Sequence, residues 1–346
     1  MIFARRAQIR LTIAIPTYNR PKSLASTISL LIPQLTPECQ LLVVDNASDP
    51  PVIDGIGPAL AELDVCRARI IRNNTNVGAN ANILRCMELC DSEWLWILSD
   101  DDRIWEDAIR TIFETIADHP TCTCLNFAQI SEPRSESSIA CGRAELLSVI
   151  GRDFYTLLFI STSVYRVAAI LPSITYGYMQ IPSCAPHLAV LLMAVDKTGT
   201  VFFSPKITVE YIPARKGTGW SQFWVDRGLP LLLDLPLNSQ DRVFLRRALR
   251  ARNRFKDVFA AYVDVLCYGL RARDLAICAQ LYKMFALRRA TLSQSPLEWL
   301  IIRCLQTTLL APGVALQGVR VAYRVAARRT LEDRAARVGL SLDEPV

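Results

Sequence analysis

Three consecutive aspartates, Asp100, Asp101 and Asp102, are the residues of this chain best suited to chemistry. They follow the apolar run of residues 94–99 (WLWILS), which is typical of a strand buried on both faces of a sheet. Three adjacent carboxylates repel one another unless water or a divalent cation neutralises them. Ligands of open α/β sheets bind beyond the carboxyl ends of the strands, which is where the triplet falls. The triplet alone still favours the alternative, a solvated acidic turn, and the rest of the chain reverses that preference.

Three further polar clusters follow strand-like runs earlier in the chain. They are residues 16–20 (PTYNR) after the run 11–15, residues 45–49 (DNASD) after the run 40–44, and residues 73–80 (NNTNVGAN) after the run 69–72. Any one of them is explained by turn chemistry, because Asn and Asp readily adopt turn conformations. Four clusters at one sheet edge, carrying an aromatic ring, amides and carboxylates, favour a nucleotide site.

The elements that position these clusters alternate between strand-like and helix-like segments. Strands are expected at residues 11–15, 40–44, 69–72, 93–98, 122–130, 159–165, 201–203 and 206–211; helices are expected at 22–35, 59–63, 80–89, 106–117 and 187–195, with Ser23 as the first N-cap. This alternation predicts βαβ crossovers and a mixed, mostly parallel sheet. From about residue 239 the pattern is helical. We therefore expect a catalytic-type α/β domain at residues 1–235 and a helical region at 236–346.

Composition excludes several classes of protein. No apolar stretch reaches membrane-spanning length, and residues 1–6 lead into a strand pattern without signal-peptide features. The 11 cysteines have no zinc-ligand spacing and indicate reduced thiols in a cytoplasmic protein. Residues 241–337 carry 19 Lys and Arg against 7 Asp and Glu, whereas the rest of the chain is acidic. The two regions are therefore expected to face different partners.

The four clusters, in their order and spacing, are similar to those of family 2 glycosyltransferases of the GT-A fold, a Rossmann-like fold. The segments IAIPTYNR (13–20), LVVDNASD (42–49), 74–80 and WILSDDD (96–102) carry the resemblance. It looks closest to the abequosyltransferase-like branch, which acts in bacterial surface polysaccharide (O-antigen) synthesis. The resemblance implies a hexosyltransferase that moves a sugar from a nucleotide-sugar donor to a saccharide or lipid-linked acceptor.

The resemblance also implies roles for single residues. Pro16, Thr17, Tyr18 and Asn19 would pack around the nucleoside, and Asp45 would accept a hydrogen bond from the base. Residues Asn76, Gly78 and Asn80 would let the backbone approach the nucleotide. Asp101 and Asp102 would hold Mg²⁺ or Mn²⁺ bridging the donor phosphates, with Asp100 facing the ribose. Which two of the three aspartates act stays open.

This chain differs from the family pattern at the position of the general base. An acidic pair is common at a later helix start, but this chain has SCAPHL at residues 183–188. His187 is therefore the candidate base, against the alternative of a histidine bonded to backbone. Asp153 and Glu210 are weaker candidates. A cationic loop containing Arg215 and Lys216 would close over the diphosphate, or else is a solvated surface turn.

The basic tail suggests a membrane surface as a partner. Its arginines recur at spacings of three and four in two groups: Arg246, Arg247, Arg250 and Arg254, then Arg320, Arg324 and Arg328. Such helices can lie peripherally on the inner face of the cell membrane, or form a solvated bundle face. No nucleic acid partner is expected, because no known module is recognisable. Two other functions stay open: a sugar nucleotidyltransferase and a non-catalytic GT-A scaffold.

Overall fold

The computed structural model describes residues 9–60, 68–211, 228–251 and 295–308, together with positions 262, 314, 317, 318 and 321. The chain divides into two compact units, Met1–Trp220 and Ser221–Val346. This division comes earlier in the chain than the boundary expected between residues 235 and 236. The boundary at residue 235 stays a prediction.

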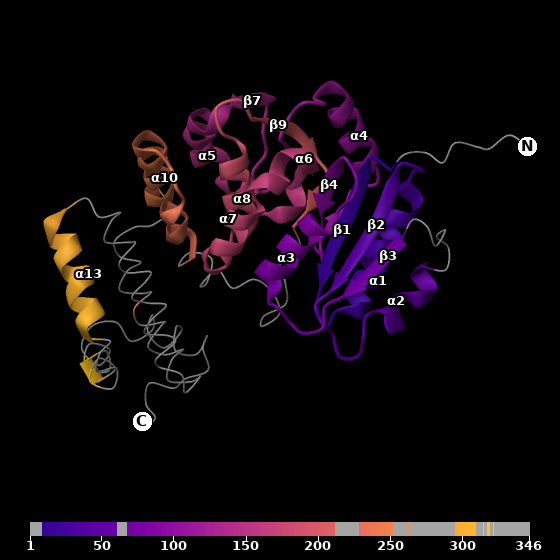
Figure 1. Ribbon diagram of the computed structural model, residues 1–346, viewed down its shortest axis with the longest axis horizontal. Coiled ribbons are helices and arrows are strands. Elements are labelled where there is room, and N and C mark those ends of the chain that lie inside the picture. Colours follow the sequence, from indigo (N-terminus) through magenta and orange to yellow (C-terminus); the bar gives the residue numbers. More distant parts are fainter. Residues whose placement is uncertain are drawn as a thin grey trace, which may run out of the picture. The chain divides into compact units, whose positions relative to one another are not determined.

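The first unit is built on an eight-stranded sheet with the strand order β3-β2-β1-β4-β8-β6-β9-β7 (Figure 1). Its strands are β1 Leu11–Thr17, β2 Cys39–Asp45, β3 Ala68–Arg72, β4 Trp94–Ile97, β6 Cys124–Ala128, β7 Ser138–Cys141, β8 Ser163–Arg166 and β9 Thr200–Ile207. The strands β3, β2, β1 and β4 are parallel neighbours, whereas β8 enters antiparallel between β4 and β6. A second sheet pairs β5 Arg103–Ile104 with β10 Val209–Glu210. The expected mixed, mostly parallel sheet is confirmed.

Both faces of the central strands are buried, which explains their continuous apolar runs. On one face, Ile13 and Trp96 belong to a core with α1 Pro21–Leu31, α2 Ile53–Leu60 and α4 Ala108–Asp118. The alternate residues, such as Ala14 and Leu95, are equally buried. Helix α3 Ala79–Glu88 packs on β1, β2 and β4, and α7 and α8 pack on α3.

The segment between the two halves of the sheet is more helical than expected. It contains α5 Gly142–Leu158, η3 Ile160–Thr162, α6 Val167–Ile170, η4 Leu171–Ser173, α7 Ile174–Met179, η5 Ile181–Ser183 and α8 Pro186–Ala194. The strand expected at residues 159–165 begins only at Ser163, because η3 precedes it. The sequence patterns missed α5 and β7.

The predicted cap of the first helix was wrong, and the second expected helix overlaps one that begins earlier; residues 61–63 lie outside the described residues. Helix α1 begins at Pro21, with Arg20 at its N-cap position and no side-chain cap, so Ser23 is not the cap. Proline is well suited to the first helical position, because its fixed φ angle fits the helix and it needs no N–H partner there. The helix expected at residues 59–63 is α2, which spans Ile53–Leu60.

In the second unit, the structure describes η6 Leu229–Asp234, α10 Ser239–Ala251 and α13 Pro296–Thr308. The side chain of Arg242 on α10 donates to the carbonyl oxygens of Leu235 and Leu237, which holds the helix against the preceding segment. The helical character expected after residue 239 is present in these described segments. None of the helices that the structure describes is both long and apolar enough to cross a membrane.

Candidate functional site

The four polar clusters meet at one edge of the sheet, because they follow the carboxyl ends of parallel strands. Backbone hydrogen bonds continue across this edge beyond the strands themselves. The amide of Asn46 donates to the carbonyl oxygen of Thr17 (2.9 Å), and the amide of Asn73 donates to that of Asp45 (2.8 Å). The loops after β1, β2 and β3 are therefore fixed to one another.

The loop after β1 is joined directly to the aspartate triplet. The hydroxyl of Thr17 donates to Asp100 Oδ2 (2.6 Å), and Arg20 Nη1 donates to Asp100 Oδ1 (3.0 Å). Asp100 is buried, and its backbone carbonyl accepts the hydroxyl of Thr27 on α1 (3.0 Å). Burial raises the pKa of Asp100, although the bonds from Thr17 and Arg20 oppose the shift. Asp100 is thus held through both oxygens of its carboxylate and through its backbone, which makes it a rigid part of the site.

The other two aspartates differ in exposure. The side chain of Asp101 is 30% exposed, accepting the Ser99 hydroxyl and Arg20 Nη1, both at 2.6 Å. Asp102 is buried and accepts the hydroxyl of Ser161 (2.6 Å). Burial raises the pKa of Asp102 to about 7, with smaller contributions from the neighbouring carboxylates. Asp101 is thus the member of the triplet that is best placed to meet a ligand.

Asp45 lies at the end of β2 and is almost fully buried. Its Oδ1 accepts the amide of Ser48 (2.9 Å), and its Oδ2 accepts Arg72 Nη1 (3.1 Å). The same Arg72 nitrogen donates to the carbonyl oxygen of Ser48 (2.8 Å). Both carboxylate oxygens therefore have protein partners, and Asp45 also closes the turn that follows β2.

A chain of amide side chains links β2 to the loop before α3. Asn46 Nδ2 donates to Asn76 Oδ1 (2.7 Å), and Asn46 Oδ1 accepts the amide of Val77 (3.0 Å). Asn76 Oδ1 also accepts the amide of Gly78 (2.8 Å), and the Asn80 side chain donates to the carbonyl oxygen of Ile181 (2.9 Å). These bonds hold the loop in one conformation.

Two features leave room for a ligand at this edge. The ring of Tyr18 is 44% exposed, which makes its face available for stacking. Gly78 has a φ angle of +84°, and a Cβ atom added there would meet nothing within 4 Å. Asn19 also has a positive φ angle, of 55°. Its backbone amide donates to Ser48 Oγ (2.8 Å), which ties the β1 and β2 loops together.

His187 lies in the first turn of α8 and is only 2% exposed. Its Nε2 contacts the carbonyl oxygen of Leu158 (3.1 Å), while Nδ1 is buried without a hydrogen-bond partner. Because a carbonyl oxygen can only accept, Nε2 carries the proton and Nδ1 is the free basic nitrogen. Burial lowers the pKa of His187 to about 4, so the ring is neutral at pH 7.

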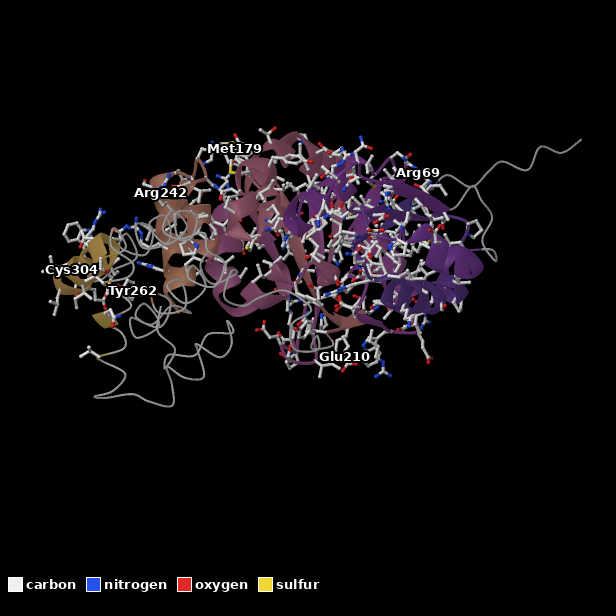
Figure 2. The ribbon with its side chains drawn as sticks, turned by 90° about the horizontal axis from the view of Figure 1, so that it is seen from below. Arg69, Met179, Glu210, Arg242, Tyr262 and Cys304 are labelled. Atoms are coloured by element: carbon white, nitrogen blue, oxygen red, sulfur yellow. The ribbon has the colours of Figure 1, made fainter. Side chains whose placement is uncertain are left out.

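Of the two weaker candidates for the base, Glu210 pairs with the residue that follows the triplet. Asp153 belongs to α5, and its side chain is outside the described part of the structure. Glu210 lies in β10, in the small sheet, and pairs with Arg103 at 3.5 Å (Figure 2). The loop residues Arg215 and Lys216 fall in the segment 212–227, outside the described residues.

The donor atoms at the triplet are compatible with a hard divalent cation. In the parts of the chain that the structure describes, no three His, Cys, Asp or Glu side chains form a group that could hold a metal ion. The protein would therefore supply one or two carboxylates and leave the other positions to phosphates and water, as is usual for Mg²⁺. The partly exposed, all-oxygen Asp101 fits that role.

Several residues of this edge were not anticipated from the sequence. Arg20 binds Asp100 and Asp101, Arg72 binds Asp45, and Ser161 binds Asp102. The side chain of Asn73 donates to those of Asn46 and Asn82. Arg20 is the last residue of the first cluster, so its position was a signal. Ser161 gave none, because it lies 59 residues after Asp102 and meets it only through the antiparallel half of the sheet.

The fold defined by this sheet and its four loops is the GT-A fold. Residues 12–147, less than half of the chain, match the family described as Glycosyl transferase family 2. A Haemophilus influenzae protein named "Uncharacterized glycosyltransferase" is 24% identical over 152 residues, covering 41% of this chain and 50% of that protein. The chain thus spans about half the length of the curated relative it matches.

Solved structures agree with the assignment of the fold. The crystal structure of S. aureus TarS 1–349 in complex with UDP-GlcNAc has a TM-score of 0.58 at 14% identity, over 87% of this chain and 89% of that chain. The crystal structure titled S. aureus TarS 1–349 has a TM-score of 0.56 at 15% identity, over 87% and 88% of the two chains. At such low identity these likenesses show the fold alone.

Proposed function

We propose that this chain is a glycosyltransferase that takes a sugar from a nucleotide-sugar donor. The observation that carries the proposal is the aspartate triplet, bonded to the β1 loop through Thr17 and set beside the fixed β2 and β3 loops. The family match of residues 12–147 covers all four loops. The crystals of TarS with UDP-GlcNAc support a nucleotide-sugar donor by analogy.

In this proposal the site residues divide the work of binding the donor. The exposed ring of Tyr18 offers a face to the base, with Pro16, Thr17 and Asn19 around the nucleoside. Asp45 would accept a hydrogen bond from the base. The loop of Asn76, Gly78 and Asn80 admits the ligand close to the backbone, and Asp100 faces the ribose.

Asp101, with Asp102, would hold Mg²⁺ or Mn²⁺, which when bound stabilises the negative charge of the departing nucleoside diphosphate. The acceptor hydroxyl attacks the anomeric carbon, and a base removes its proton. We assign that role to His187 Nδ1, the unpaired nitrogen. The loop with Arg215 and Lys216 would cover the diphosphate and exclude water.

The acceptor proposed here is a saccharide or a lipid-linked saccharide of a bacterial surface polysaccharide. The resemblance to the abequosyltransferase-like branch supports this choice. A peripheral contact with the inner face of the membrane would bring the enzyme to such an acceptor. The exposed apolar residues Leu297, Leu300 and Ile301 on α13, beside Cys304 (Figure 2), and the basic composition of the tail support that contact.

The decisive test is turnover of UDP-, GDP-, dTDP- and CDP-sugars by the full-length chain, with and without Mn²⁺. We expect one nucleotide class to be consumed, and Asp101→Asn to lower that turnover by at least about a hundredfold, as loss of a charge-stabilising group does. Asp91→Asn, which alters an exposed ion pair with Arg69, is the matched control and should retain activity.

Each outcome distinguishes one class of protein from another. Nucleotide binding without turnover would instead support a non-catalytic scaffold. Formation of a nucleotide sugar from a nucleoside triphosphate would support a nucleotidyltransferase. If none of the nucleotides binds, the proposed function is wrong.

A further inference from the structure

The aspartate triplet already holds a cation of the protein's own. Arg20 Nη1 donates to Asp100 Oδ1 at 3.0 Å and to Asp101 Oδ2 at 2.6 Å, so a single nitrogen bridges both carboxylates. The Arg20 side chain is 30% exposed, which is the same fraction as that of Asp101. Its guanidinium thus occupies the open side of the two carboxylates, which is the side that a ligand would approach.

The remaining carboxylate oxygens of these two residues have internal partners. Asp100 Oδ2 accepts Thr17 Oγ1, and Asp101 Oδ1 accepts Ser99 Oγ, both at 2.6 Å. Only the two oxygens that face Arg20 are bound by a charged group on a long, partly exposed side chain. A metal ion that approaches Asp101 from solvent therefore competes with this guanidinium rather than with the buried hydroxyls.

The backbone of Arg20 is fixed while its side chain can turn. Its carbonyl oxygen accepts the amide of Leu24 (3.0 Å), and the next residue, Pro21, begins α1. Movement of the guanidinium away from the aspartates is therefore confined to the side-chain torsions. A displaced guanidinium needs a new anion, and a diphosphate binds guanidinium groups well through charge-assisted hydrogen bonds.

We propose that Arg20 is a positioning residue that competes with the divalent cation for Asp101 and Asp100, so that the metal binds tightly only together with the donor diphosphate. Asp100 and Asp101 would exchange Arg20 for the metal, and Arg20 would take the diphosphate as its new partner. This inference rests on the proposed function for its diphosphate, but the competition itself concerns only the free protein and the metal.

The test measures Mn²⁺ binding to the full-length chain without nucleotide. Binding is monitored through the electron paramagnetic resonance signal of free Mn²⁺. Because Arg20→Gln removes the positive charge that competes for the two carboxylates, it should bind Mn²⁺ roughly tenfold more tightly or better. Arg110→Gln removes the same charge from an exposed ion pair with Asp107 and should bind as the wild type does.

A double variant tests whether Arg20→Gln raises the Mn²⁺ affinity through Asp101. Arg20→Gln combined with Asp101→Asn should lose the gain in Mn²⁺ affinity, because the freed carboxylate is gone. In the wild type, the nucleoside diphosphate that the donor screen selects should tighten Mn²⁺ binding, and Arg20→Gln should reduce this coupling. Equal Mn²⁺ affinity of Arg20→Gln and the wild type would overturn the inference.

Folding is checked by circular dichroism and urea unfolding of every variant. If Arg20→Gln does not fold, Arg20→Met carries the test, because it also removes the charge and keeps an unbranched side chain. It should bind Mn²⁺ roughly tenfold more tightly than the wild type, and wild-type affinity would again contradict the competition. A wild type that turns over no nucleotide sugar would overturn the proposed function but leave this comparison intact.

Discussion

At the scale of single residues, burial shifts the pKa values of two ionisable groups of the first unit in opposite directions. The pKa of Asp102 rises to about 7 and that of His187 falls to about 4, in both cases chiefly because burial disfavours the charged form. Both groups therefore favour the neutral state compared with a solvated side chain. The proposed base is neutral and ready to accept a proton, although it is a weak base.

This state of His187 leads to a prediction about pH. Because its folded pKa lies below the ordinary value of 6.5, the stability it contributes is present above pH 6.5 and lost as the pH falls towards 4. His187→Gln can still donate to the carbonyl oxygen of Leu158 but does not titrate. Between pH 7.5 and 4.5 we expect the variant to lose about 2 kcal/mol less stability than the wild type, measured by urea unfolding.

The same variant tests the role of His187 in the reaction. If Nδ1 is the base, His187→Gln should fold normally at pH 7.5 and lower kcat by about 10²- to 10⁴-fold, as loss of a general base does. An unchanged kcat in a folded variant would show that the histidine is structural.

The residues with a charge or a turn preference could be identified from the sequence, but their partners could not. Asp45, Gly78 and the triplet stand in short, recognisable clusters after strands. Arg72 meets Asp45 across 27 residues, and Ser161 meets Asp102 across 59 residues. Such pairs depend on which strands become neighbours, and this is fixed by the packing of the whole sheet rather than by local spacing.

At the scale of elements, strands with a long apolar run were predicted correctly. Elements with a weak hydrophobic pattern were missed. Strands β1, β2 and β4 were predicted because they are buried on both faces and read as apolar runs. Strand β7 was missed because its side chains are mostly exposed. Helix α5 was missed because its sequence, which includes an internal glycine, has little amphipathic pattern.

The start of α3 depends on one glycine. Gly78 is the N-cap residue with φ +84° and ψ 155°, a conformation that is essentially restricted to glycine. Gly78→Ala should therefore destabilise the protein by about 1–3 kcal/mol, although no atom blocks the new methyl group. Thermal unfolding measures the loss, and the Km for the donor should rise because the loop shifts.

Gly57→Ala is the control for this prediction. Gly57 lies inside α2, has no positive φ angle and also has open space around the added carbon. The gain in helix propensity, up to about 1 kcal/mol, is opposed by Pro58, because a proline disfavours a helical residue with a Cβ atom before it. We therefore expect Gly57→Ala to change the stability less than Gly78→Ala does. Equal effects of the two substitutions would contradict the conformational explanation.

At the scale of the whole molecule, the two units differ in charge. Residues 221–346 carry 20 Lys and Arg against 11 Asp and Glu, whereas residues 1–220 carry 19 against 22. The second unit also presents the exposed apolar residues Leu297, Leu300 and Ile301 at helical spacing on α13. Basic charge next to exposed apolar residues is the combination that binds anionic membrane surfaces.

Sedimentation with lipid vesicles tests this proposal on the full-length chain. We expect binding to vesicles rich in phosphatidylglycerol, little binding to pure phosphatidylcholine, and release at high salt, which screens the attraction. Leu300→Ser should weaken binding by roughly tenfold, since burying a leucine contributes about 1.5–3 kcal/mol. The control is Ile139→Ser, which alters a residue of the first unit that is 45% exposed, against 53% for Leu300.

Ser161 has a consequence for where this protein can be divided. Its hydroxyl donates to Asp102 and accepts the amide of Ser99 (3.0 Å), and its carbonyl oxygen accepts the indole of Trp96 (2.7 Å). The family match, however, ends at residue 147. A fragment cut at that limit would contain every aspartate of the triplet but lack the residue that anchors their strand end. A piece of this chain that keeps the anchor of the triplet must therefore extend at least to Ser161, beyond the segment that matches the family.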